Sequence, residues 1–288
     1  MRASESLFHP IRGLRYHVRH WARAGAPKMV LLHGWMDVSA SFQFMVDALR
    51  GAWDVYAPDW RGYGLTEWEK ADSYWFPDYI ADVELLLEKI TPGEKANLVG
   101  HSLGGNVATI YAGVRPERVA KLVNLEGFGM APTVADQAPK RYARWLEELR
   151  DPPGLRPYES FSALADRLQQ GNQRLSRERA EFLARHWGRE EGGNVLLRSD
   201  PKHKIVNPVL YRYEEARACW RQVSAPVLWV DAAGSETLKR LGLSDAQHAE
   251  RRAAFRSLRH ETVPDAGHML HHDQPEAVAA LVEEFLAA

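Results

Sequence analysis

Short apolar runs alternate with segments of helical periodicity in the first 127 residues and again after residue 225. The predicted strands fall at residues 14–21, 28–34, 53–59, 95–100, 119–127, 226–231 and 259–264. The predicted helices fall at residues 41–50, 78–90 and 103–114 and from Pro275 onward. Because this alternation is typical of a mostly parallel sheet with helices on both faces, the sequence predicts an α/β fold.

The alternation breaks at residue 128, and residues 128 to about 220 contain no convincing buried strand. Their helical stretches are separated by breaks rich in proline and glycine, such as "DPPGLRP" and "GREEGGN". We therefore predict a helical cap at 128–220, inserted between a first core part at 1–127 and a second core part at 221–288.

Charge and cysteine content limit the possible partners. The 37 Lys and Arg residues nearly balance the 38 Asp and Glu residues, so no overall charge draws the chain to nucleic acid, and a small-molecule substrate is expected. No apolar segment approaches the roughly 18 residues of a membrane span. The single cysteine, Cys219, excludes an internal disulfide and favours a reducing, cytoplasmic location. The sequence does not specify the oligomeric state or the physiological substrate.

The motif "GHSLG" at residues 100–104 fits the pattern G-x-S-x-G between a predicted strand and a predicted helix. In that context the serine lies on a sharp turn, which needs small flanking residues, and Gly100 and Gly104 supply them. The N-terminus of the following helix favours negative charge beside Ser102. Ser102 is therefore the predicted nucleophile.

A serine needs a base to remove its proton, and "PDAGHMLHH" follows the strand predicted at 259–264. This places His268 in a loop at the carboxyl edge of the sheet, where Ser102 also lies. We expect His271 and His272 to lie on the approach to the final helix, solvated or making local hydrogen bonds.

The tetrahedral intermediate of acyl transfer needs two backbone N–H donors for its oxyanion. Leu103, which follows the nucleophile, supplies one, and the loop "HGWMD" at 33–37 is expected to supply the other from Trp35. Gly34 lets this loop turn toward the site. His33 is interpreted as a buried structural histidine.

The motifs "LLHGWMDVSASF", "PDWRGYGLT", "LVGHSLGGNVA" and "DAGHMLHHDQPEAV" resemble the α/β-hydrolase superfamily and occur in its order. The cap stretch "LADRLQQGNQRLSRERAEFLARHWG" with "NVLLRSDPKHK" further resembles the serine hydrolase-like branch, whose members are capped and esterase-like. The resemblance implies a triad of Ser, acid and His, with no metal and no cofactor. Dehalogenase and epoxide hydrolase members of this superfamily carry Asp at the elbow, and Ser102 argues against both.

The acid of the triad is less constrained, because Glu126, Asp231 and Glu236 all lie between Ser102 and His268 in the chain. In the commonest arrangement of the superfamily the acid lies a few residues past the strand at 226–231. This chain has Gly234 and Ser235 there. Glu126, at the end of the neighbouring strand, is the favoured choice, and Glu236 and Asp231 stay open as alternatives.

The combined motifs predict a serine hydrolase that cleaves a carboxylic ester or a related acyl bond through an acyl-enzyme. The aromatic residues of the cap favour a small apolar substrate. Two alternatives use the same features: a carbon-carbon bond hydrolase or perhydrolase, and a small-molecule binding module with slow turnover.

Overall fold

The computed structural model describes all 288 residues, Met1 to Ala288. At its centre is an eight-stranded sheet in the order β1-β2-β4-β3-β5-β6-β9-β10. The bounds of these strands, in chain order, are β1 Glu5–Ile11, β2 Leu14–Trp21, β3 Lys28–Leu32, β4 Asp54–Pro58, β5 Ala96–His101, β6 Val119–Leu125, β9 Val227–Ala232 and β10 Leu258–Val263.

Strands β3 to β10 of this sheet pair in parallel, and only β1 with β2 and β2 with β4 pair antiparallel. This confirms the predicted fold class, and each predicted strand is present within a few residues of its expected bounds. The strand β1 was not predicted. It forms an edge hairpin with β2, closed by a turn in which Gly13 has φ of 81°.

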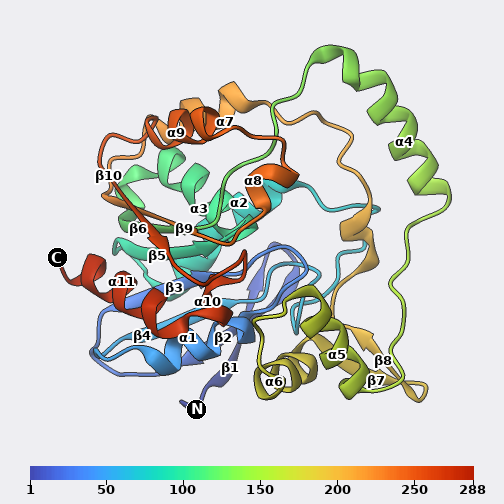
Figure 1. Cartoon of the computed structure of the whole chain (residues 1–288), viewed down its shortest axis with the longest axis horizontal. Coiled ribbons are helices and arrows are strands. Elements are labelled where there is room, and N and C mark those ends of the chain that lie inside the picture. Colours follow the sequence, from blue (N-terminus) through green and yellow to red (C-terminus); the bar gives the residue numbers. More distant parts are fainter.

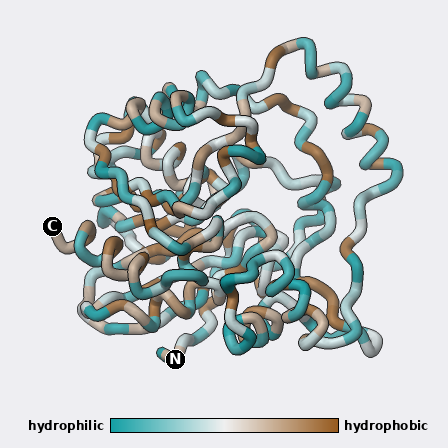
Figure 2. The backbone as a smooth tube through the Cα atoms, in the orientation of Figure 1, coloured by the Kyte–Doolittle hydropathy of each residue, from teal (hydrophilic) through white to brown (hydrophobic).

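Helices cover both faces of the sheet (Figure 1). Helix bounds, in chain order, are α1 Gln43–Ala48, α2 Phe76–Ile90, α3 Leu103–Val114, α4 Ala138–Arg150, α5 Phe161–Gly171, α6 Arg177–Trp187, α7 Tyr213–Trp220, α8 Thr237–Arg240, α9 Asp245–Arg252, α10 Leu270–Asp273 and α11 Pro275–Ala287. One hydrophobic cluster joins the sheet to α2, α3 and α7, and a second joins it to α1 and α11. Figure 2 shows hydrophobic residues concentrated along the central strands, as two-sided burial requires.

The chain leaves the sheet after β6 and returns at β9. Between them lie α4 to α7 and a two-stranded hairpin, β7 (Gly188–Glu191) with β8 (Asn194–Leu197). The sequence did not predict this hairpin, whose residues are largely exposed or half-buried. Helix α7 packs directly on α3, because a Cβ at Gly113 would lie only 2.0 Å from the carbonyl oxygen of Cys219.

The carboxyl ends of β3, β5, β6, β9 and β10 lie at one edge of the sheet, since these strands are parallel neighbours. Open parallel sheets bind ligands at this edge. The loops that follow these five strands therefore define where a site can form. None of the helices combines the length and the apolar character needed to cross a lipid bilayer.

Candidate active site

Ser102 lies on a strained turn between β5 and α3. Its backbone has φ of 51° and ψ of −112°, a region that residues with a side chain rarely occupy. The turn is held by a hydrogen bond from the Ser102 N–H to the carbonyl of Leu125, at 2.8 Å. It also needs the two predicted glycines: a Cβ at Gly100 would lie 2.4 Å from the carbonyl oxygen of Gly104, and one at Gly104 would lie 2.0 Å from that of Leu32.

His268 follows β10 and faces this serine. Its Nε2 lies 3.0 Å from the Ser102 hydroxyl, within hydrogen-bond distance for proton transfer. The imidazole of His101 donates from its Nε2 to the carbonyl of His268, at 2.8 Å, which fixes the backbone that carries the ring. The His268 side chain is 25% exposed, so the pair can be reached from solvent.

Glu126, directly after the end of β6, contacts His268. Its Oε2 lies 3.1 Å from the Nδ1 of His268, on the side of the ring opposite Ser102. The carboxylate is fully buried and accepts a second hydrogen bond from the Ala232 N–H, at 2.8 Å from Oε1. The backbone of Glu126 has φ of 56°, and this left-handed conformation turns the chain at the strand end.

The structure does not bring the two alternative acids to His268. Asp231 accepts hydrogen bonds from the indole of Trp229 at 2.8 Å and from Arg252 at 3.2 Å, and lies 2.7 Å from the Nε2 of His260. Glu236 lies at the N-cap of α8 with its side chain 68% exposed, 3.3 Å from the ammonium group of Lys239.

The two predicted oxyanion donors, the N–H groups of Leu103 and Trp35, have no backbone partner that would occupy them. Leu103 is the first residue of α3, so its N–H has no partner within the helix. The N–H of Trp35 makes no hydrogen bond to the backbone either. Gly34, next to Trp35, lies against the elbow, because a Cβ there would be 3.4 Å from the Cβ of Ser102. The Trp35 side chain is 53% exposed and therefore belongs to the surface around the site, not to the core.

The other histidines near the site are buried. His33 accepts from the Trp60 N–H at 2.9 Å and donates to the Gly34 carbonyl at 2.8 Å, and burial lowers its pKa to about 4. It is a neutral structural residue, as interpreted. The expectation that His271 and His272 are solvated or bonded locally is wrong. They are 0% and 2% exposed, because the turn into α10 directs both rings inward toward the hydroxyl of Ser41.

From the sequence we missed two hydroxyl residues that contact the predicted acid and base. The Ser235 hydroxyl donates to the Oε2 of Glu126, and the Thr237 hydroxyl lies 3.1 Å from the Nδ1 of His268. The departure from the usual acid position at Gly234 and Ser235 was the available signal. It showed that the carboxylate was absent from the loop after β9, but not that a hydroxyl there contacts the acid.

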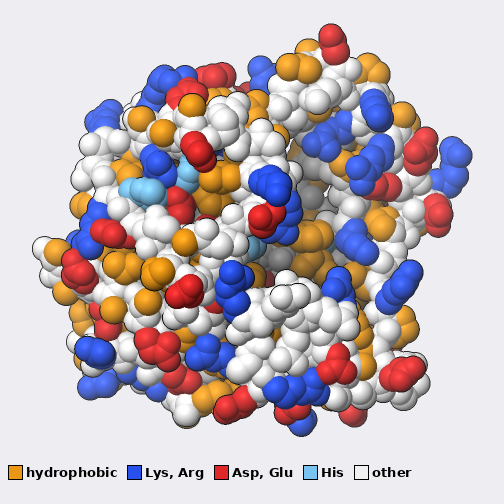
Figure 3. Space-filling view, viewed as in Figure 1, with side chains coloured by type: hydrophobic (Ala, Val, Ile, Leu, Met, Phe, Trp, Pro, Cys, Tyr) orange, Lys and Arg blue, Asp and Glu red, His pale blue; other side chains and the backbone are white.

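Two cavities lie next to the inserted segment. One, of about 300 Å³, is lined by residues of α5 and α6 together with Trp187, Met269 and His272, and so adjoins the loop of His268. The other, of about 550 Å³, lies between α4 and α7 and is lined by Tyr142, Val209 and Tyr213 among others. Figure 3 shows the molecule hollowed between the body and the part that carries α4.

Comparisons with known proteins agree with this fold. Residues 27–275 match the family model described as the alpha/beta hydrolase fold. A serine hydrolase-like protein of Danio rerio is 27% identical over 287 residues, covering 92% of this chain and 83% of that protein. A 3-hydroxybutyrate-oligomer hydrolase of Cupriavidus necator is 28% identical, covering 96% and 93%. Among solved structures, a thioesterase domain from the curacin biosynthetic pathway has a TM-score of 0.87 at 22% identity, covering 98% of this chain and 99% of that domain.

Proposed function

The chain belongs to the alpha/beta hydrolase fold family, with relatives in the predicted serine hydrolase-like branch, and we propose that it hydrolyses a carboxylic ester or related acyl bond through an acyl-enzyme. The observation that carries this proposal is the continuous hydrogen-bonded line from Ser102 through His268 to Glu126, with distances of 3.0 and 3.1 Å. The same three residue types in this order of contact activate a nucleophilic serine.

In the proposed reaction the Nε2 of His268 takes the hydroxyl proton as Ser102 attacks the carbonyl carbon. Glu126 holds the ring with its Nδ1 proton toward the carboxylate and stabilises the imidazolium that forms. The N–H groups of Leu103 and Trp35 bind the oxyanion. His268 then protonates the leaving alcohol, and water attacks the acyl-enzyme by the same route in reverse.

The residues around the cavity next to His268 favour an apolar substrate. Eight of its twelve lining residues are hydrophobic, and they include Leu164, Leu183 and Trp187. We propose that this cavity receives the acyl or the alcohol part of a small ester. The name of one similar protein, a 3-hydroxybutyrate-oligomer hydrolase, is compatible with an ester substrate.

We also propose that residues 128–220 act as a cap that shapes access to the serine. Trp35, in the loop after β3, and Met130, at the start of this segment, have exposed side chains that an apolar substrate could contact. A cytoplasmic location, which rests on the lone Cys219, stays a prediction.

Covalent labelling tests the nucleophile. We expect a fluorophosphonate to add to wild type at Ser102, as located by peptide mass spectrometry, and to leave Ser102→Ala unlabelled. Glu236→Gln, a change at an exposed residue of the same region, is the matched control and should label as wild type does. Equal labelling of wild type and Ser102→Ala would refute the proposal.

A substrate panel separates the reaction classes. With p-nitrophenyl esters of increasing acyl length, we expect a burst of nitrophenol that is stoichiometric with enzyme if the acyl-enzyme accumulates. Labelling of Ser102 without turnover of any ester, thioester or carbon-carbon substrate would instead indicate a binding module.

A further inference from the structure

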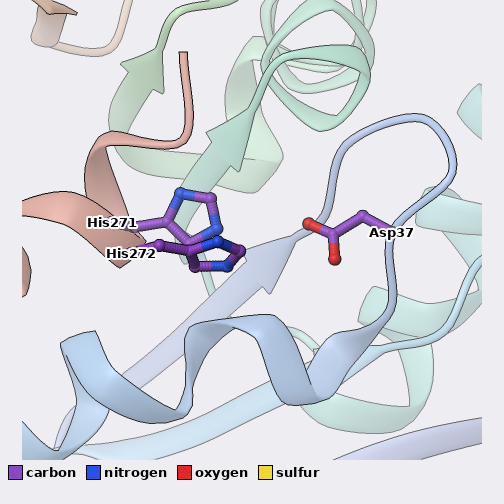
Figure 4. A group of neighbouring side chains, drawn as sticks. All are labelled: Asp37, His271 and His272. Atoms are coloured by element: carbon purple, nitrogen blue, oxygen red, sulfur yellow. The ribbon is translucent and has the colours of Figure 1, made fainter. Parts of the chain in front are cut away.

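A second cluster of polar side chains is buried near the proposed active site. Asp37, His271 and His272 are 1%, 0% and 2% exposed, and one ligand atom from each lies within 4.8 Å of the others. Figure 4 shows the two imidazoles side by side at the start of α10 and the Asp37 carboxylate directed toward them from the loop after β3. The hydroxyl of Ser41 lies among them, 2.5 Å from the Nε2 of His272 and 3.4 Å from that of His271.

The protein leaves part of this group without hydrogen bonds. One carboxylate oxygen of Asp37 accepts from the Val38 N–H at 2.8 Å. The other has no hydrogen bond of good geometry, although the Ser41 hydroxyl and the Trp187 indole lie beside the carboxylate. The Nδ1 of His271 has none either. Buried polar atoms are nearly always paired, and an unpaired one costs free energy. The second carboxylate oxygen of Asp37 and the Nδ1 of His271 could therefore both bind one ligand, and a ligand that binds both nitrogen and oxygen donors is a metal ion.

The donor set identifies the class of ligand. Two imidazoles and one carboxylate suit a divalent first-row transition metal, whereas Mg²⁺ and Ca²⁺ prefer oxygen alone. Zn²⁺ takes four such ligands at roughly 2.0–2.2 Å, which leaves room for a fourth donor. The Ser41 hydroxyl or a water molecule can fill that place. The ligand atoms lie within 4.8 Å of one another and must move closer together to hold an ion.

We propose that Asp37, His271 and His272 form a binding site for a divalent transition metal ion, with Zn²⁺ the best match. The site does not depend on the hydrolase reaction. It joins two segments of the fold that lie 234 residues apart, because Asp37 ends the loop that carries Trp35, and His271 follows the loop that carries His268. A bound ion would hold these two loops in one arrangement.

The ion can reach this site from the cavity beneath α5 and α6, since His272 contributes to the cavity wall. One positive charge opposes binding: Arg179 donates to the carbonyl oxygen of His272, at 2.5 Å. Its guanidinium lies 3.9 Å from Glu276, which offsets part of that charge.

Zinc binding to the full chain, first treated with EDTA and then freed of the chelator, tests the proposal. Titration with ZnCl₂ in a calorimeter should give one saturable site, and Zn²⁺ should raise the Tm by at least about 2 °C. Asp37→Asn and His272→Gln should each weaken binding by at least about 10-fold and remove the rise in Tm. The matched control is His260→Gln, because His260 lies in another His and Asp cluster whose centre is taken by Arg252. This control should bind Zn²⁺ as wild type does.

Binding that is absent in wild type, or that is unchanged in Asp37→Asn and His272→Gln, would overturn the proposal. A second measurement needs no variant and so remains valid if the variants do not fold. X-ray absorption of the zinc-loaded wild type should show two imidazole ligands and a remainder of oxygen, and a shell with fewer than two imidazoles would equally overturn it.

Discussion

At the scale of single residues, Glu126 takes, in the proposed triad, the place of a carboxylate that the loop after β9 lacks. It reaches His268 from the neighbouring strand because its side chain is long and its left-handed backbone, at φ of 56°, turns it toward the histidine. Ser235, in the usual acid position, donates its hydroxyl to the same carboxylate. The loop after β9 thus orients the acid without supplying it.

Replacing Glu126 by Gln should lower kcat by about 10³ to 10⁴-fold with little change in KM. The amide cannot stabilise the imidazolium and favours the wrong tautomer of His268. Glu236→Gln, at a side chain that is 68% exposed, is the control and should leave kcat within about 2-fold. Steady-state kinetics on one ester measures both, and a loss confined to Glu236→Gln would identify the other carboxylate as the acid.

Ser235→Asp in the Glu126→Gln background should restore at least about 10-fold of the lost kcat. The new carboxylate would stand where the hydroxyl now contacts Glu126 and could accept the Nδ1 proton of His268. In wild-type background the same change should lower kcat, since two carboxylates would lie side by side. Unchanged activity of the double variant would mean that this loop cannot reach the histidine.

At the scale of elements, the elbow depends on how closely α3 approaches β3. Gly104→Ala should destabilise the fold by about 2–3 kcal/mol, because its Cβ would lie 2.0 Å from the carbonyl oxygen of Leu32, in rigid backbone. Gly171→Ala at the end of α5 meets no atom within 4 Å, so it should be neutral or slightly stabilising. Urea unfolding compares the two, and equal midpoints would contradict the argument.

Helices and strands were predictable from the sequence where one or both of their faces are buried, because burial gives their apolar residues a regular spacing. Strand β9 and helix α11 follow their apolar patterns, and the motif around Ser102 predicted the elbow because only small residues fit there. The hairpin of β7 and β8 was missed because its strands have four residues each and little burial. The inward rings of His271 and His272 were missed because their partner Ser41 lies 230 residues or more away in the chain, and local sequence does not report such contacts.

At the scale of the whole molecule, three neutral histidines join separate parts of the fold. His33 links the loop after β3 to Trp60, and His203 stacks between Tyr63 and Tyr74, with ring centroids 3.9 and 3.7 Å away. His248 packs against Phe128 at 5.1 Å. In each case burial is the main cause that lowers the pKa, to about 4 for His33, about 3 for His203 and about 4 for His248.

Because these three histidines are buried in the neutral form, we expect the free energy of unfolding to fall in mild acid. Below pH of about 6.5 the unfolded chain takes up a proton at each of the three, whereas the folded chain does not until about pH 4 for His33 and His248 and about pH 3 for His203. Each therefore removes about 1.4 kcal/mol of unfolding free energy per pH unit. Asp37 works in the opposite direction, because burial raises its pKa to about 7 and the folded chain binds the extra proton. The net loss from these four groups is roughly 3 kcal/mol per pH unit.

Urea unfolding in EDTA at pH 7.5, 6.0 and 5.0 measures this slope. His203→Gln should make it shallower by about 1.4 kcal/mol per pH unit, because the variant has one fewer group that gains a proton on unfolding. His9→Gln, at a half-buried histidine near the chain terminus whose pKa burial also lowers, should change the slope by less than His203→Gln does. An unfolding free energy that stays constant, or rises, as the pH falls from 7.5 to 5.0 would contradict this prediction, because the three histidines would then not outweigh Asp37.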